Sequence, residues 1–327
     1  PVSVLYGITM RIRALLYRSG MKPSYRARVP VISVGNVTAG GTGKTPMVDF
    51  LVKKLVNKGI NCAVVSRGYG GQFRGAVARV GDHDGSSLTP AECGDEPFLL
   101  AVRNPGTPVY VARQRKLGVR RAERDGAQII ILDDGFQHLA VARDLDLLLL
   151  DADQPFGNGR TLPAGMLREP IAAVHRSDLI ILTRSTGNET ISLPLAAPIL
   201  RCHHQLSSHL EDLSGHQVSV QDIANQRCLA FAGIAKPDAF FDALRQAGLK
   251  TMTAYPLADH QDYSEEVLMR LREASDGHDL MITTQKDAVK LGTVDFPVPC
   301  YSIGVELVFE ETELLDNSIN QLVENRS

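Results

Sequence analysis

The sequence lacks the features that mark secreted, membrane-spanning and nucleic-acid-binding proteins. Its five cysteines are scattered, odd in number and without metal-site pairing, which argues against a disulfide framework and favours buried thiols in a reducing cytoplasm. No apolar run is long enough to span a membrane, and no segment resembles a cleavable signal. The net charge of −2 argues against a general nucleic-acid binder. Because the chain starts at Pro1, we expect residues to precede it.

Acidic residues are absent before Asp49, although six arginines and lysines crowd residues 1–28. If this segment is helical, one face collects the apolar side chains of Val4, Leu5, Ile8, Ile12, Leu15 and Leu16. An apolar face rimmed by arginine is typical of an interfacial helix on anionic lipid. A helix packed on the protein's own core, with its arginines in solvent, explains the pattern equally well.

Residues 38–45 match a phosphate-binding P-loop. They follow an apolar run at 30–34 that predicts a buried strand, and they precede a helical pattern at 47–55. Glycines let backbone N–H groups converge on phosphate oxygens, Lys44 reaches the outer phosphates, and the Thr45 hydroxyl is placed to ligate Mg²⁺. Thr38 replaces the glycine that starts the generic pattern. The candidate nucleotide-binding residues are Thr38, Ala39, Gly40, Gly41, Thr42, Gly43, Lys44 and Thr45.

Two carboxylates, Asp133 and Asp134, end the apolar run at 129–132. A carboxylate at the end of a strand beside a P-loop can hold Mg²⁺ directly or through water. An ordinary acidic turn is the alternative, and the P-loop upstream makes us favour the metal site. Gln137 and His138 follow, and either can face the nucleotide or serve a structural purpose.

Other polar residues are candidates for the chemistry of phosphoryl transfer. Asp95, in a long glycine-rich stretch at 67–97, can accept the proton of an attacking hydroxyl, although a loop acid taken alone is more simply explained by solvation. His260 lies beside Asp259, which can tune it near neutral pH, but a lone histidine is usually structural. Arg168 can stabilise charge on a transferring phosphoryl group or lie in a surface turn. The sequence does not show whether Asp95 and His260 meet.

The segment 283–287 follows a predicted strand and can contact a base or ribose. It lacks the Asn-Lys-x-Asp order of guanine recognition, which removes a GTPase from consideration. A P-loop ATPase or switch, whose output is a conformational change, is the alternative to a kinase, and ATP consumption that requires an acceptor would separate the two. A nicotinamide-binding Rossmann domain is a weaker interpretation, because the Gly43-Lys44-Thr45 sequence suits a triphosphate.

Alternating strand and helix patterns predict an α/β fold: a P-loop NTPase-like parallel sheet flanked by helices, with a second, smaller α/β domain and an N-terminal amphipathic helix. The expected divisions are the helix at 1–28, the P-loop domain at 29–203, a connector at 204–227 and the smaller domain at 228–327. Strands are expected at 62–65, 109–111, 129–132, 147–150, 179–182, 229–232, 250–255, 280–283 and 298–301, with helices at 237–247 and 264–274.

Short motifs recur in a fixed order along nearly the whole chain. They are VGN (34–36), GGTGKTP (40–46), SRGYG (66–70), GDEP (94–97), DDGFQH (133–138), FGNG (156–159), LREP (167–170), FAGI (231–234) and TQKD (284–287). With these motifs in this order, the chain resembles the tetraacyldisaccharide 4'-kinases of bacterial lipid A biosynthesis. Met166 departs from the proline that is usual at its position. The alternative to such a kinase is a P-loop ATPase or switch module without a lipid acceptor.

The resemblance implies a kinase that moves the γ-phosphate of ATP to the 4'-hydroxyl of a tetraacyldisaccharide 1-phosphate. It implies that Asp95 together with His260 acts as the general base. It also implies that Lys44 and Arg168 stabilise the charge of the transferring phosphoryl group, and that Thr45 with Asp133 and Asp134 holds Mg²⁺. The small domain would close over the nucleotide. A membrane-bound lipid substrate reached from the cytoplasmic face favours the anionic-lipid interpretation of residues 1–28, and so a peripheral protein of the inner membrane. No nucleic-acid partner is expected, and no protein partner can be inferred from the sequence.

Overall fold

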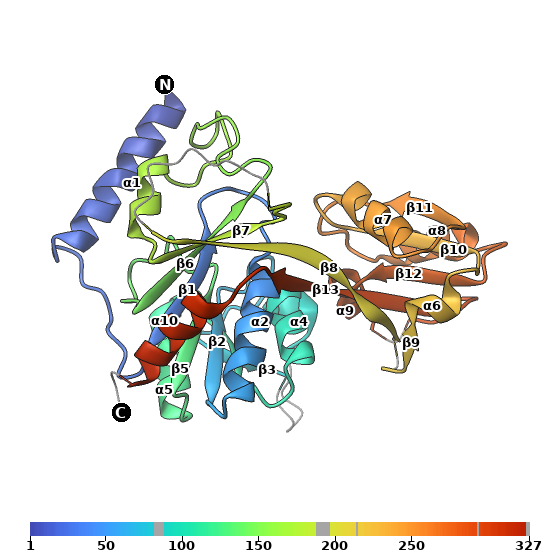
Figure 1. The fold of residues 1–327 in the computed structure, drawn as a ribbon, viewed down its shortest axis with the longest axis horizontal. Helices are drawn as coiled ribbons and strands as arrows, with labels where there is room; N and C mark the ends of the chain where they lie inside the picture. Colours follow the sequence, from blue (N-terminus) through green and yellow to red (C-terminus); the bar gives the residue numbers. More distant parts are fainter. Residues whose placement is uncertain (82–87, 188–196, 214, 293, 325–327) are drawn as a thin grey trace. The chain divides into compact units, whose positions relative to one another are not determined.

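The computed structural model describes residues 1–81, 88–187, 197–213, 215–292 and 294–324, and it divides into two compact units. Unit 1 comprises Pro1–His204 with Leu307–Ser327, and unit 2 comprises Gln205–Glu306. The chain passes from unit 1 to unit 2 within β8 (Ile199–Asp212) and returns within β13 (Cys300–Phe309) (Figure 1).

Unit 1 is built on a sheet in the order β8-β7-β6-β1-β5-β2-β4-β3, in which only the β3–β4 pair is antiparallel among the pairs described in this unit. The central strands are completely buried, as their near-continuous apolar sequences predict. This confirms the predicted parallel sheet. The strands are β1 (Val31–Asn36), β2 (Cys62–Ser66), β3 (Ala78–Val80), β4 (Val109–Val111), β5 (Ile129–Asp133), β6 (Leu145–Asp151) and β7 (Leu179–Thr183).

Helices cover both faces of this sheet. On β1, Ile32 and Val34 pack in one cluster with α2, α4 and α10, whereas Val31 packs in another with α5 (Figure 1). Successive side chains of a strand point to opposite faces of the sheet, so alternate residues of β1 pack in the two hydrophobic clusters on either side. The helices are α1 (Val2–Arg18), α2 (Lys44–Asn57), α3 (Pro90–Cys93), α4 (Asp95–Arg103), α5 (Arg115–Arg124), the 3₁₀ helix η1 (Ile171–Arg176) and α10 (Glu313–Glu324).

Unit 2 repeats the plan at smaller size, with parallel strands in the order β11-β10-β12-β13. The side chains of β10 alternate between a cluster that includes α7 and a cluster that includes α8. The far end of β8 pairs antiparallel with β9. The elements are β9 (Gln217–Ser219), α6 (Val220–Ile223), β10 (Cys228–Ala232), α7 (Pro237–Gln246), β11 (Met252–Pro256), α8 (Glu265–Ala274), β12 (Leu280–Thr284) and α9 (Gln285–Leu291).

Two segments differ from the expected divisions. Residues 204–227, expected as a connector, contain most of β8 together with β9 and α6. Residues 307–327, expected with the smaller domain, belong to unit 1. The physical reason is packing on α2: Asp316 of α10 pairs with Lys54 at 2.9 Å, and the ring of Phe309, the last residue of β13, lies 4.7 Å from the ring of Phe50.

The docking of α10 gives a test of this assignment. Leu315 is fully buried in the core of unit 1, whereas Leu314 is 41% exposed. We expect Leu315→Ala to destabilise unit 1 by about 2–5 kcal/mol, because it leaves a cavity under the helix. Leu314→Ala, the matched control, should stay within about 0.5 kcal/mol. The sequence has no tryptophan whose fluorescence could report unfolding, so thermal unfolding of both variants is followed by circular dichroism. Equal unfolding midpoints for the two variants would contradict the packing of α10.

Candidate active site

The P-loop and the two adjacent carboxylates lie at one edge of the sheet in unit 1. β1 pairs in parallel with β5, with Val34 opposite Asp133. Because the carboxyl ends of parallel strands meet at the same edge, the loop after β1 and the turn after β5 are neighbours. The predicted order of strand, glycine-rich loop and helix is therefore present, with α2 beginning at Lys44.

Residues at the end of β7 and just after it donate hydrogen bonds to the P-loop. Gly43 precedes α2 with φ 85°, and a Cβ there would lie 2.6 Å from Nε2 of His204, so the position requires glycine. The Thr183 hydroxyl donates to the Thr42 carbonyl at 3.0 Å, and Arg184 Nη2 donates to the Gly41 carbonyl at 3.0 Å. A loop that offers its amides to phosphate needs partners for its carbonyls, and these two donors supply them.

The Asp134 carboxylate joins the two predicted charge stabilisers. Arg168 Nη1 donates to both of its oxygens, at 2.8 and 2.9 Å, and Lys44 Nζ lies 3.7 Å from Oδ1. Burial alone would raise the pKa of Asp134, but the charges of Lys44 and Arg168 outweigh it and the pKa is lowered. Lys44 also donates to Asn36 Oδ1 at 3.4 Å. The structure thus brings together Lys44, Asp134 and Arg168, which lie far apart in the sequence.

Asp133 is more deeply buried and has an unfilled oxygen. Oδ2 accepts a hydrogen bond from Ser66 at 2.8 Å, whereas Oδ1 is buried without a partner among the described residues. Burial raises the pKa of Asp133, and the charges of Glu96 and Asp134 raise it further. A buried acceptor of this kind suits a cation, so the residues present fit Mg²⁺.

No group of three or more His, Cys, Asp or Glu side chains that would hold a metal by itself lies in the described part of the chain. A magnesium ion beside a P-loop takes most of its ligands from phosphate, water and one hydroxyl, so a larger protein cage is not required. The assignment of Thr45, Asp133 and Asp134 as metal ligands stays a prediction.

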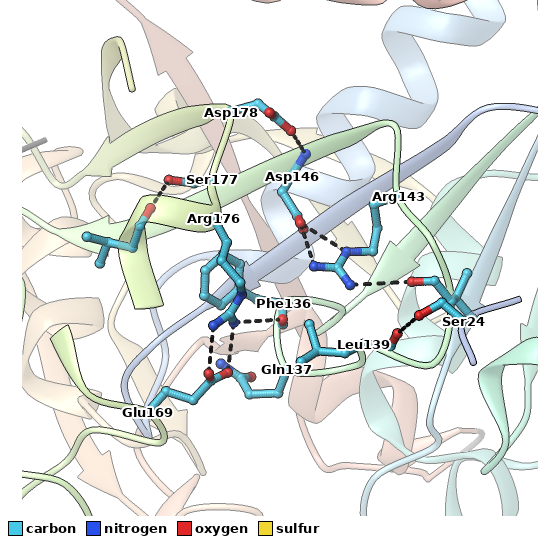
Figure 2. A network of polar contacts seen from close by, with 12 residues as sticks. Ser24, Phe136, Gln137, Leu139, Arg143, Asp146, Glu169, Arg176, Ser177 and Asp178 are labelled. Atoms are coloured by element: carbon cyan, nitrogen blue, oxygen red, sulfur yellow. Dashed lines mark hydrogen bonds and ion pairs between the residues drawn. The ribbon is translucent and has the colours of Figure 1, made fainter. Parts of the chain in front are cut away.

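Arg168 lies on a loop that is tied to the P-loop by main-chain bonds. Its N–H donates to the Val37 carbonyl at 2.7 Å, and the Ala39 N–H donates to the Met166 carbonyl at 2.7 Å. The next residue, Glu169, is buried and accepts two hydrogen bonds from Arg176, at 2.8 and 2.9 Å (Figure 2). The Arg176 guanidinium also lies 4.5 Å from the Phe136 ring centroid. Arg168 therefore lies in an anchored loop and not in a free surface turn.

Sequence reasoning missed Arg115 and did not assign a role to Ser66. Arg115, the first residue of α5, is 3% exposed, and its Nη2 donates to the carbonyls of Asp133 and Asp134 at 3.0 and 3.2 Å. It fixes the backbone that carries both carboxylates. The available signal was positional, because Arg115 shortly follows the strand at 109–111 and Ser66 ends β2, both at the same edge of the sheet.

Gln137 has a structural partner, and the charge state of His138 follows from its surroundings. Gln137 Nε2 donates to the Asn36 carbonyl at 2.8 Å. Burial, together with the charges of Arg115 and Arg13, lowers the pKa of His138 to about 4. His138 is therefore neutral near pH 7.

Asp95 and His260 lie in different units. Asp95 is the first residue of α4 and not a loop residue, and it follows Gly94, whose φ is 92°. Its neighbour Glu96 contributes to the raised pKa of Asp133, which connects this helix start electrostatically with the carboxylates. His260 belongs to unit 2, in the loop between β11 and α8, with φ 57°.

Helix α1 packs on unit 1 through its polar side. The Tyr6 hydroxyl donates to the Arg168 carbonyl at 3.0 Å, the Ser3 hydroxyl donates to the Thr161 carbonyl at 2.6 Å, and Arg13 Nη2 donates to the Gln137 carbonyl at 3.0 Å. Its apolar face is exposed except for Leu16, which is half-buried, so most of that face does not pack on the protein's own core. The exposed side chains are Val2, Val4, Leu5, Ile8, Ile12 and Leu15.

A parallel sheet, a P-loop and two strand-end carboxylates beside an arginine define a P-loop phosphotransferase. The family model "Tetraacyldisaccharide-1-P 4'-kinase" matches residues 1–324. The chain belongs to this family. Among the described residues, no helix is both long and apolar enough to cross a membrane.

Relatives of the same description cover nearly the full length. The tetraacyldisaccharide 4'-kinase of Syntrophotalea carbinolica is 46% identical over 100% of this chain and 92% of its own. That of Geobacter sulfurreducens is 46% identical over 93% and 87%. The Aquifex aeolicus LpxK crystal structure, described as in complex with ATP, is 29% identical, has a TM-score of 0.84 and matches 99% of this chain and 98% of its own.

The activity of the family follows for this chain. It is an ATP-dependent phosphotransferase with an alcohol acceptor, acting as a tetraacyldisaccharide 4'-kinase in lipid A biosynthesis, and a lipid disaccharide is its substrate. The predicted ATP and Mg²⁺ agree with this class of enzyme.

Removing the P-loop cation tests the site. We expect Lys44→Ala to lower kcat by about 10²–10³ while the fold stays intact, because it removes a charge that stabilises the transferring phosphoryl group. Steady-state kinetics with circular dichroism as the folding control measure this. Lys250→Ala, at an exposed position of unit 2, serves as the control. A folded Lys44→Ala enzyme with wild-type kcat would show that the loop is not the catalytic P-loop.

Proposed function

We propose that the γ-phosphate passes to the 4'-hydroxyl at the site in unit 1. Residues 38–45 hold the triphosphate, Lys44 and Arg168 stabilise its charge, and Thr45 with Asp133 and Asp134 holds Mg²⁺, which neutralises phosphate oxygens when bound. The observation that carries this proposal is the ion pairing of Asp134 with both Lys44 and Arg168, which gathers the cations beside the P-loop.

Asp95 accepts the proton of the attacking 4'-hydroxyl, and His260 supports it. Two observations favour Asp95: it stands at the start of α4, and its neighbour Glu96 is close enough to influence Asp133. Since Asp95 and His260 belong to different units, the proposal requires unit 2 to act as a lid that brings His260 to the nucleotide.

Dependence on the acceptor separates a kinase from a P-loop ATPase. With ATP, Mg²⁺ and a tetraacyldisaccharide 1-phosphate, we expect ATP to be consumed in equal amount to a product that carries a new 4'-phosphate. Without the acceptor, consumption should be negligible. ATP hydrolysis at an unchanged rate without the lipid would favour a switch or ATPase module.

The role of Asp95 predicts a separation of kinetic constants. We expect Asp95→Ala to lower kcat by about 10²–10⁴, the usual contribution of a positioned general base, with little change in the KM for ATP. Asp276→Ala, a substitution of an exposed acid in unit 2, is the control and should leave both constants unchanged. If Asp95→Ala mainly raises the KM for ATP, Asp95 instead contacts the nucleotide or the metal.

Helix α1 lies on the surface of an anionic bilayer, at the cytoplasmic face of the inner membrane. Its exposed apolar face and the six basic residues of 1–28 provide the apolar and the electrostatic part of the affinity. Because α1 contacts the carbonyl of Arg168, a protein bound in this way would meet its lipid substrate beside the site.

Substitutions on the exposed face test this without removing the contacts of α1 with unit 1. We expect the combined change of Leu5, Ile8, Ile12 and Leu15 to serine to abolish flotation with anionic liposomes and to raise the KM for the lipid, but not for ATP. Val56→Ser, at an apolar side chain that is 51% exposed on α2, is the control. High salt should release part of the wild-type protein only, since screening removes the contribution of about 1 kcal/mol per basic residue and leaves the apolar contribution. Flotation of the serine variant equal to wild type would contradict the role of α1.

A further inference from the structure

The segment 283–287 adjoins the loop that carries His260. Its contact with a base or ribose stays a prediction. β12 ends at Thr284, and α9 begins at Gln285. Two successive side chains of this segment, Lys286 and Asp287, contact different parts of the neighbouring loops in unit 2.

Asp287 is linked to the backbone of His260 by hydrogen bonds through Gly233. It is completely buried, and its Oδ2 accepts hydrogen bonds from the Gly233 N–H at 3.0 Å and the Thr284 hydroxyl at 2.7 Å. The Gly233 carbonyl in turn accepts from the His260 N–H at 3.1 Å. A Cβ on Gly233 would lie 2.9 Å from Cβ of Gln261 and 3.0 Å from Oδ1 of Asp287, so the contact requires glycine.

Lys286 contacts the imidazole itself. Its Nζ lies 3.4 Å from Nε2 of His260, which is within hydrogen-bond distance. An ammonium group has donors only, so Nε2 must accept. In the neutral ring the hydrogen is then on Nδ1. The backbone of His260 has φ 57°, an uncommon conformation for a residue with a side chain, which the surrounding contacts support.

We propose that Lys286 is a positioning residue that holds His260 in its Nδ1–H tautomer, while Asp287 fixes the backbone of the same residue through Gly233. The tautomer follows from the contacts within unit 2, and its effect on turnover rests on the proposed role of His260. An Nδ1–H group donates to a carboxylate, so His260 would orient the Asp95 carboxylate and would not itself accept the proton at that nitrogen.

The tautomer can be read directly in the intact, ligand-free protein by ¹H–¹⁵N correlation of the imidazole rings. At about pH 8, where an ordinary imidazole is neutral, the signals that disappear in His260→Gln assign the ring. We expect wild type and Lys250→Met to show the Nδ1–H pattern. Lys286→Met should shift His260 toward Nε2–H, and Lys286→Arg, which keeps a donor, should restore Nδ1–H. An Nε2–H pattern in wild type, or no change in Lys286→Met, would overturn the proposal.

Kinetics show whether the tautomer matters to the reaction. We expect Lys286→Met to lower kcat about 10-fold to 100-fold, as for a misplaced catalytic group, with an unchanged KM for ATP. In a His260→Ala background the same substitution should have no further effect, since both act through one ring. A further loss there would contradict positioning through His260. A wild-type kcat for His260→Ala itself would refute the proposed action of His260 with Asp95 as the general base. The imidazole spectra would still show which tautomer His260 adopts.

Discussion

The Asp134 carboxylate connects the segments that form the site in unit 1. Asp134 directly follows β5 and has φ 49°. Its carboxylate accepts hydrogen bonds from the Arg168 guanidinium and lies 3.7 Å from Nζ of Lys44, the first residue of α2. A half-buried carboxylate without cations would be less stable, and two cations without a carboxylate would repel each other. The three groups therefore fix one another. Because phosphate oxygens carry the same sign of charge as Asp134, a nucleotide would meet cations that are already in position.

The loop that carries Arg168 also receives α1. Ser3 and Tyr6 donate to carbonyls at the two ends of its 161–168 segment, and the loop is bonded to the P-loop on its other side. Polar bonds fix the inner side of α1, so its apolar side chains remain outside. A helix with this division of faces would offer a surface for lipid, and it lies against the backbone of Arg168, the proposed charge stabiliser.

The parts of the site predicted from sequence are those encoded within a few residues. The P-loop, the carboxylates after 129–132 and the buried strands depend on local spacing and apolar runs, and they were found. Arg115 was missed because its partners are backbone carbonyls of another strand end. The contacts of Lys286 and Asp287 near His260 were not predicted, because only the tertiary structure brings these segments together. The units differ from the expected divisions because β8 continues through the boundary expected at 203–204, and because the chain returns to unit 1 within β13, where no boundary was expected.

The most direct test of the central claim is a crystal structure of the full chain with a non-hydrolysable ATP analogue, Mg²⁺ and the tetraacyldisaccharide 1-phosphate. The account predicts the γ-phosphate beside Lys44 and Arg168, with Mg²⁺ on Thr45 and at least one of Asp133 and Asp134. It also predicts the 4'-hydroxyl within hydrogen-bond distance of Asp95, and His260 Nδ1 on that carboxylate. A γ-phosphate remote from Arg168, or an acceptor hydroxyl that contacts neither Asp95 nor a group held by it, would contradict the account.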